Sequence, residues 1–321
     1  MTSPVSLFDH AMRLHRESPD VPLPQEGYPF PDDPWHGFDA TPSRSGHWRA
    51  EGMELAALLD AHFGDPVRSP ADLAAECHSV HVPPYRNEHV AAAALRVDAE
   101  RVRATGRWLV RRGTDRCAVW IGLALLGTVP DDADIPLLRT IGLLSDAFSR
   151  LAVDALARCR DGTAALLWLG PRVDEWGREI VVEKLCEHPG STVRDWLLRN
   201  SCRGNYLDGY VAGKVAIAAD LATAITADDP DLDLVHHTTV LLSAMTYCAG
   251  AGLTLDEYPA AARVLDAHSR QVARLEPSTD RYRHVGTLAD YVRRAEPAGW
   301  ERMSERYPDL LNRPDWAAYA P

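Results

Sequence analysis

Apolar residues recur along most of the chain at helical spacing, most densely between Asp115 and Gly127. That stretch is apolar on nearly all sides, so a helix formed by it must be buried all round. Shorter helical segments alternate with longer ones as far as residue 225, and turns containing proline, glycine or aspartate join them. From Asn87 onward the pattern therefore predicts an almost purely helical protein.

The longer helices begin at nearly regular intervals. Their starts, near Asp115, Phe148, Trp176 and Tyr206, lie 33, 28 and 30 residues apart. Each unit is a longer buried helix, a turn and a shorter helix. A period near 30 residues in helix pairs is typical of an α-solenoid, in which neighbouring units stack to bury one continuous core.

The shorter helices carry a resemblance to a known family. Residues 134–139 (DIPLLR), 163–168 (TAALLW) and 192–198 (TVRDWLL) look like second helices of HEAT-type repeats. The resemblance covers roughly residues 88–228, and the units are shorter than the ~40 residues usual for that family. It implies an all-α, HEAT-like solenoid of antiparallel helix pairs, and it implies no particular activity.

The resemblance and the helix pattern together predict three parts. Residues 1–86 form N-terminal helices plus a proline-rich strap, with an amphipathic helix at Val5–Glu17. Residues 87–230 form the HEAT-like repeats. Residues 231–321 form a C-terminal helical cap continuous with the solenoid, including a long helix that Thr254 caps. Such a cap shields the last apolar face of a solenoid from water.

The predicted strap, Ser18 to Trp48, holds seven prolines between Pro19 and Pro42 and cannot propagate a helix. It also holds five aromatic residues that a free linker would not need: Tyr28, Phe30, Trp35, Phe38 and Trp48. Two interpretations stand. The segment either packs across the first helices, which we favour, or serves as a detachable arm that recognises a partner.

Charge narrows the classes of partner. The chain has 34 basic and 46 acidic residues and a net charge of −12, which disfavours nucleic acid and anionic membrane and suits a basic partner. All but two of the basic residues are arginine, as expected of a GC-rich bacterial genome. The longest apolar run, Cys117–Val129, is shorter than the roughly 20 residues that span a bilayer.

No continuous hydrophobic segment occurs between Met1 and Asp20, so we expect no signal peptide and a cytoplasmic protein. Most of the six cysteines lie inside apolar helical runs, and no pair has the spacing CxxC. We therefore expect buried, reduced thiols.

Aromatic and charged residues in successive repeats form the candidate binding site. If corresponding faces of the repeats align, they line one groove: Trp168, Arg172, Trp176, Arg178, Asp195, Trp196, Tyr206, Tyr210 and Lys214. Tryptophan, tyrosine and arginine are common anchors at protein interfaces. The alternative is that the tryptophans fill gaps between helix pairs with one edge in water.

The densest basic run offers a second candidate surface. It comprises Arg101, Arg103, Arg107, Arg111, Arg112 and Arg116, and three of these share one helical face. A phosphate-binding stripe is one interpretation. Because acidic residues lie in the same segment, we favour intramolecular ion pairs.

Two further patterns were considered as a metal site and a phosphate site, and neither has the required spacing. Cys77, His78 and His81, with His89 nearby, lack the spacing of a zinc site, so the sequence predicts no metal and no cofactor. The turn Gly204–Gly209 lacks the Walker pattern and a preceding strand, so it predicts no phosphate site.

The function that follows is a non-catalytic protein-binding scaffold, of the adaptor or inhibitor type. The alternative is a HEAT-like DNA glycosylase for alkylated bases, for which Asp195 beside Trp196 is the nearest analogue of a catalytic acid. A continuous positive groove around Arg107, Arg172 and Arg178 would favour the glycosylase. A mixed or negative groove would favour the scaffold.

Overall fold

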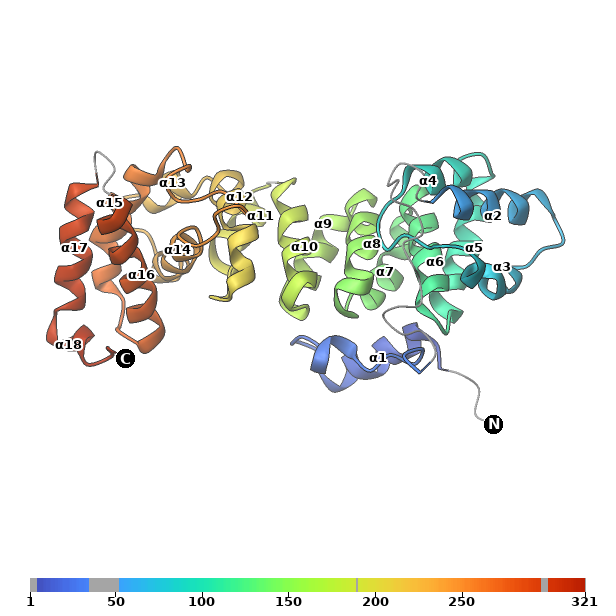
Figure 1. The fold of residues 1–321 in the computed structure, drawn as a ribbon, viewed down its shortest axis with the longest axis horizontal. Coiled ribbons are helices and arrows are strands. Elements are labelled where there is room, and N and C mark those ends of the chain that lie inside the picture. Colours follow the sequence, from blue (N-terminus) through green and yellow to red (C-terminus); the bar gives the residue numbers. More distant parts are fainter. Residues whose placement is uncertain (1–4, 35–51, 189, 296–299, 321) are drawn as a thin grey trace. The chain divides into compact units, whose positions relative to one another are not determined.

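The computed structural model describes residues 5–34, 52–188, 190–295 and 300–320, and every regular element in these ranges is a helix. The all-α prediction is therefore confirmed for the described chain (Figure 1). The chain divides into two compact units, Met1–Lys184 and Leu185–Pro321. This division lies inside the segment predicted as repeats.

Unit 1 contains the first ten α-helices, the last of which ends two residues past the division. They are α1 (Leu7–Glu17), α2 (Met53–Gly64), α3 (Pro70–Glu76), α4 (Glu88–Ala94), α5 (Ala99–Arg112), α6 (Arg116–Thr128), α7 (Ile135–Ile141), α8 (Ser145–Arg158), α9 (Gly162–Leu169) and α10 (Glu175–Cys186). Short 3₁₀ turns lie between them: η1 (Pro24–Gly27), η3 (Cys77–Ser79), η4 (Asp132–Asp134) and η5 (Gly170–Arg172).

The helices of unit 1 contact one another in two rows. In one row α3 contacts α5, α5 contacts α7, and α7 contacts α9. In the other α2 contacts α4, α4 contacts α6, and α6 contacts α8. Contacts of α5 with α6, and of α8 with α7 and α9, join the rows, and α1 lies across α5 and α7 (Figure 1).

The helix α6 is the centre of unit 1. Residues along its whole length are buried, as its apolar sequence predicts. Asp115 caps its N-terminus by accepting a hydrogen bond from the backbone N–H of Ala118 at 3.0 Å. Its closest neighbour is α5, and the two helices meet at Gly106 and Gly122, where a Cβ on Gly122 would lie 2.9 Å from the carbonyl oxygen of Gly106. Two facing glycines therefore permit this crossing.

Unit 2 contains the remaining helices. They are α11 (Ser191–Asn200), α12 (Ala212–Ala218), α13 (Leu221–Ile225), α14 (Leu232–Ala244), α15 (Ala261–Gln271), α16 (Thr279–Ala295), α17 (Glu301–Leu311) and α18 (Pro314–Ala317), with 3₁₀ turns η6 (Tyr206–Tyr210) and η7 (Val272–Arg274). The central helix α14 is buried along most of its length and contacts α11, α12, α13, α15 and α16.

Several predicted boundaries need correction. The sequence pattern left open whether Asn87 to Arg112 forms one long helix or a broken one, and the structure has two helices, because Asp98 starts a new one by capping α5. Thr254 does not cap a long helix. Its backbone N–H and its hydroxyl group both donate to Glu257 in a turn, and Pro259 precedes the start of α15 at Ala261.

All six cysteines are free thiols, and five of them are buried. Burial raises the pKa of the Cys117 thiol to about 12 and that of the Cys159 thiol to about 11. These thiols are therefore protonated at neutral pH and pack as small apolar side chains, as the sequence predicts.

Candidate partner-binding surfaces

Residues 6–33, the N-terminal segment from here on, pack on the row of helices formed by α5, α7 and α9. Near the start of the segment, the backbone N–H of Leu7 donates to the carbonyl oxygen of Gly113 at 3.0 Å. Leu7 and Ala11 on α1 are fully buried. His10 Nε2 lies 2.7 Å from the carbonyl oxygen of Gly27, so α1 also contacts η1, which follows it in the segment.

Trp168, at the end of α9, is in contact with two arginines. The guanidinium carbons of Arg139 and Arg172 are each 4.5 Å from the centroid of the Trp168 ring. The ring of His15, from α1, meets the same indole edge-on at 5.4 Å. Burial, together with the charges of Arg172 and Arg139, lowers the pKa of His15. Both cations over this indole are attracted by its π face.

Arg172, in η5, holds the N-terminal segment by hydrogen bonds. Its Nε donates to the carbonyl oxygen of Pro19 at 2.8 Å, and its Nη2 donates to a carboxylate oxygen of Asp20 at 2.7 Å. Its Nη1 donates to the carbonyl oxygen of Trp168 at 2.9 Å. The guanidinium group thus binds both backbone and side chain of a peptide stretch that lies more than 150 positions away in sequence.

The end of the segment contacts α6 and α8, which belong to the other row of helices. Phe30 is buried, with its ring centroid 5.4 Å from that of Phe148 on α8. Asp32 is fully buried and binds Arg116, whose Nε and Nη2 donate to its two carboxylate oxygens at 2.8 and 3.0 Å. The backbone N–H of Arg116 donates to the same carboxylate at 2.9 Å. Between residues 18 and 34 the predicted strap therefore contacts α6, α8 and η5 of unit 1, and its remainder, residues 35–48, lies outside the described ranges.

The other two candidate residues of unit 1 differ in exposure. Trp176, on α10, is 36% exposed. Arg178 is 2% exposed, and its Nη1 donates to the carbonyl oxygen of Gly170. A guanidinium group this deeply buried supports the loop before α10 and offers no surface to a partner. We therefore leave Arg178 out of the candidate surface.

In unit 2 the candidate residues lie on α11, η6 and α12, of which α12 contacts the other two. Asp195 is exposed on α11, where Arg199 pairs with it and with Asp231. Trp196 on the same helix is half-buried. Tyr206 is 70% exposed, Tyr210 is half-buried, and Lys214 on α12 is exposed. Two of the three aromatic rings are therefore half-buried, and the third is largely open to water.

The turn before η6 forms a small anion cradle that the chain itself fills. The backbone N–H groups of Arg203, Gly204 and Asn205 all donate to the carboxylate of Asp208, at distances from 2.6 to 3.2 Å. Asp208 is fully buried. The donors that could hold a phosphate are thus already used, and the turn positions Tyr206 and Tyr210 instead.

Four arginines of the basic run contact side chains or backbone of the same chain. Arg101 donates to the carbonyl oxygens of Phe63 and Asp65. Arg103 and Arg107 both pair with Asp131, and Arg107 also pairs with Asp134. The guanidinium group of Arg111 lies 5.0 Å above the ring of Phe8. These contacts favour the interpretation of the run as intramolecular ion pairs over its interpretation as a phosphate-binding stripe.

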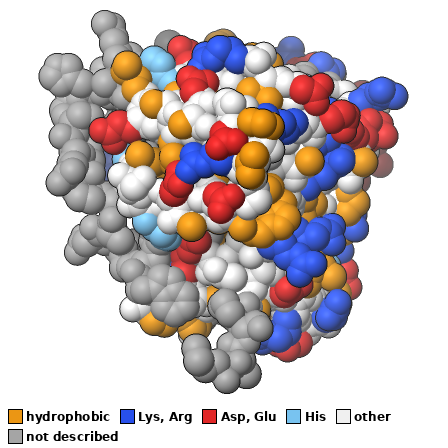
Figure 2. Space-filling model, turned by 90° about the vertical axis from the view of Figure 1, so that its right-hand side faces the viewer, with side chains coloured by type: hydrophobic (Ala, Val, Ile, Leu, Met, Phe, Trp, Pro, Cys, Tyr) orange, Lys and Arg blue, Asp and Glu red, His pale blue; other side chains and the backbone are white. Residues whose placement is uncertain are grey.

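Three arginines were expected to distinguish a nucleic-acid groove from a protein groove, and each has an acidic partner or is buried. Arg107 and Arg172 are paired with aspartates, and Arg178 is buried. One face of the molecule, drawn in Figure 2, likewise shows basic side chains lying beside acidic ones.

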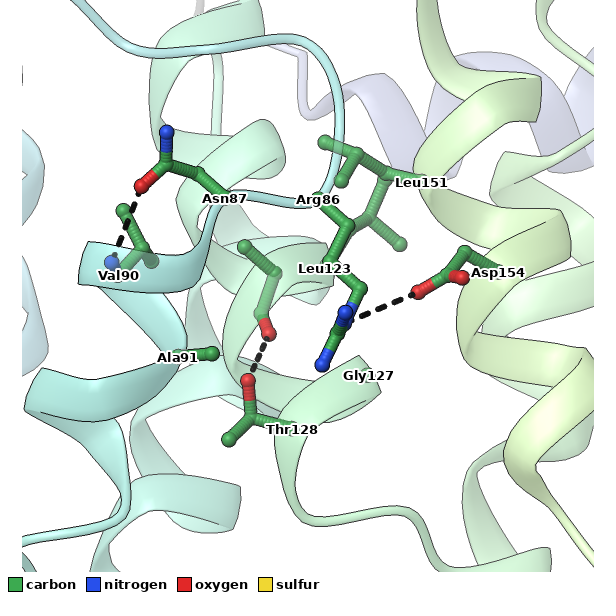
Figure 3. Close-up of a pocket in the computed structure, with 10 residues that line it drawn as sticks. Arg86, Asn87, Val90, Ala91, Leu123, Gly127, Thr128, Leu151 and Asp154 are labelled. Atoms are coloured by element: carbon green, nitrogen blue, oxygen red, sulfur yellow. Dashed lines mark hydrogen bonds and ion pairs between the residues drawn. The ribbon is translucent and has the colours of Figure 1, made fainter. Parts of the chain in front are cut away.

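A small pocket lies among α4, α6 and α8 (Figure 3). Its polar groups serve the local structure: Arg86 faces Asp154 at 4.0 Å, Asn87 caps α4, and Thr128 donates to the carbonyl oxygen of Ala124. The rest of the lining is apolar, including Val90, Leu123 and Leu151. We assign no ligand to this pocket.

Several residues that make these contacts were not in the groove predicted from the sequence. They are His15, Asp20, Asp32 and Arg139, together with Arg116, which the sequence placed only in the basic run. Each acts through a partner distant in sequence, and no local spacing signals such a pair. The one available signal was the cluster of aromatic residues in the strap, among them Phe30.

No protein-family model matches the chain, and neither the curated proteins nor the solved structures searched contain a match. Among the described residues, no helix combines the length and the apolar character that crossing a membrane requires.

Proposed function

We propose that this chain is a HEAT-like solenoid scaffold that binds a protein or peptide partner without catalysing a reaction. The rows of unit 1 support the solenoid part of the proposal. In stacked antiparallel helix pairs, first helices contact first helices and second helices contact second helices. The contacts of α5 with α7 and α7 with α9, and of α4 with α6 and α6 with α8, follow that rule.

The observation that carries the binding role is the way unit 1 holds a peptide. Trp168 and Arg172, named as groove residues from the sequence, contact His15, Pro19 and Asp20 of the N-terminal segment. Arginines stacked on an aromatic ring, and a guanidinium that binds main-chain carbonyl groups, are contacts that interfaces between proteins use. In this chain the ligand of unit 1 is its own segment.

The surface proposed for an external partner lies in unit 2, on α11, η6 and α12. Trp196, Tyr206 and Tyr210 supply aromatic area there, and Asp195 and Lys214 supply charge at the edge. Tyrosine and tryptophan are enriched at the residues that dominate binding energy. The net charge of −12 favours a partner that is basic.

The test uses the full chain as bait in lysate of the source organism, with captured proteins quantified by mass spectrometry. Substituting Trp196→Ala and Tyr206→Ala together is expected to reduce capture of a specific partner at least about tenfold, as for interface anchors. Tyr319→Ala is the matched control, because Tyr319 is a 40% exposed tyrosine near the C-terminus of the same unit. It should leave capture unchanged.

The glycosylase alternative is tested in parallel by release of alkylated bases from DNA. The paired and buried states of Arg107, Arg172 and Arg178 argue against it, since a DNA groove needs free positive charge. Base release that Asp195→Asn abolishes, without a stable captured partner, would overturn the scaffold proposal.

A further inference from the structure

Three side chains able to ligate a metal ion meet beside the N-terminus of α6. Cys77 and His78 lie in η3, and Asp115 is the residue that caps α6. The Sγ atom of Cys77 is 3.7 Å from Oδ1 of Asp115, and Nε2 of His78 is 3.6 Å from the same oxygen. All three ligand atoms lie within 4.8 Å of one another.

These distances are close to those of a tetrahedral zinc site. Zinc binds thiolate sulfur at about 2.3 Å and imidazole nitrogen or carboxylate oxygen at about 2.0–2.2 Å. Neighbouring ligands of a tetrahedron with those bond lengths are about 3.3–3.6 Å apart. Small side-chain rotations of His78 and Cys77 would therefore bring the three atoms onto one ion. A mixed set of sulfur, nitrogen and oxygen ligands suits zinc better than magnesium or calcium.

Burial leaves an entry path and an open coordination position. Cys77 is fully buried, and the side chain of Asp115 is 12% exposed, whereas that of His78 is 50% exposed. An ion can therefore enter from the His78 side, and a water molecule can supply the fourth ligand there. The backbone N–H of Ala118, 3.0 Å from Oδ1 of Asp115, already orients the carboxylate, as outer hydrogen bonds do in zinc sites.

The same residues do not suit nucleophilic catalysis. A fully buried thiol cannot reach a substrate, and the Cys77 Sγ lies 3.0 Å from the carbonyl oxygen of Ala74, to which it can donate. His78 faces Asp115 rather than standing between the thiol and the acid. A metal ion uses all three groups at once.

We infer that Cys77, His78 and Asp115 bind one zinc ion, with water as the fourth ligand. On binding, the proton of the Cys77 thiol is lost to solvent, and the thiolate takes its place on the metal. The ion would connect η3 to the start of α6, next to Arg116, which holds Asp32 of the N-terminal segment. The sequence predicted no metal because Cys77, His78 and His81, with His89 nearby, lack the spacing of a zinc site, and no local pattern points to Asp115, 38 positions from Cys77.

Cobalt(II) titration of the reduced full chain tests the site directly. A cysteine-ligated tetrahedral site gives a thiolate-to-cobalt charge-transfer band and intense visible bands at one equivalent, and zinc should then displace the cobalt. Cys77→Ser should remove the charge-transfer band. His78→Gln and Asp115→Asn should each weaken zinc binding by at least about 100-fold, more than the loss of an outer-sphere partner usually does.

Two features keep this experiment decisive. His78 is exposed and asparagine remains a good N-cap, so His78→Gln and Asp115→Asn both leave the fold intact even if Cys77→Ser does not. His81→Gln, a neighbouring histidine outside the cluster, is the matched control and should bind zinc as the wild type does. Absence of the charge-transfer band in the wild type, or its survival in Cys77→Ser, would overturn the inference.

Discussion

The buried His268 shows how one side chain affects the stability of unit 2. His268 is fully buried and lies between Thr239 and Tyr307. Because the Thr239 hydroxyl donates to the carbonyl oxygen of Val235, it accepts from Nε2–H of His268 at 2.8 Å. Nδ1 of His268 then accepts from the Tyr307 hydroxyl at 2.8 Å. The ring is thus neutral, and burial lowers its pKa to about 3.

This arrangement predicts that unit 2 loses stability on mild acidification. Between pH 6.5 and 3 the unfolded chain protonates this histidine and the folded chain does not, so stability falls as pH falls. From pH 7 to pH 5 the loss from His268 amounts to about 2 kcal/mol. Urea unfolding at the two pH values measures it. His268→Gln should reduce the difference by that amount, and an unchanged difference would show that the ring is not buried and neutral.

Trp120 provides a second test at the same scale. It lies on α6, is 8% exposed, and donates from Nε1 to the carbonyl oxygen of Ala147 at 2.7 Å. Trp120→Ala should therefore lower the free energy of unfolding by about 3–5 kcal/mol, from lost burial and a remaining cavity. Chemical denaturation gives the value, and a loss near zero would mean that the side chain does not pack between α6 and α8.

At the scale of elements, most helices follow from the sequence, whereas several ends do not. The longer helix predicted to start near Tyr206 was wrong, because Tyr206–Tyr210 is the 3₁₀ turn η6 and the short helix α12 starts only at Ala212. The helix α13 ends at Ile225, where the alternation of helices was predicted to end, and α6 matches its apolar run to within one residue. The break between α4 and α5 was left open, since helical periodicity continues across it. The start of α15 was misplaced because Thr254 has cap chemistry but uses it in a turn.

The crossing of α5 and α6 predicts opposite effects for two glycine substitutions. A Cβ on Gly122 would lie 2.8 Å from Val110 Cγ2 and 2.9 Å from the carbonyl oxygen of Gly106. Gly122→Ala should therefore destabilise the protein by about 1–3 kcal/mol through overpacking. Gly286, inside α16, has no such neighbour within 4 Å. Gly286→Ala should stabilise by about 0.5–1 kcal/mol through helix propensity. Thermal unfolding compares them, and equal effects would contradict this crossing.

At the scale of the whole molecule, the sequence indicated the kind of surface but not its occupant. Trp168 and Arg172 were recognisable as interface anchors from residue type and repeat position. That they bind residues 15–20 of the same chain depends on contacts between distant parts of the sequence, which no local pattern encodes. For the same reason Asp115 could not be joined to Cys77 and His78.

Unit 1 binds a peptide, its own N-terminal segment, through Trp168 and Arg172. Hydrogen exchange of the full chain measures this directly. The amides of α1 should exchange as slowly as those of α5, and Arg172→Ala, which removes the bonds to Pro19 and Asp20, should speed exchange in α1 while leaving α5 protected. Exchange of α1 at the rate of a free peptide in the wild-type chain would contradict the account.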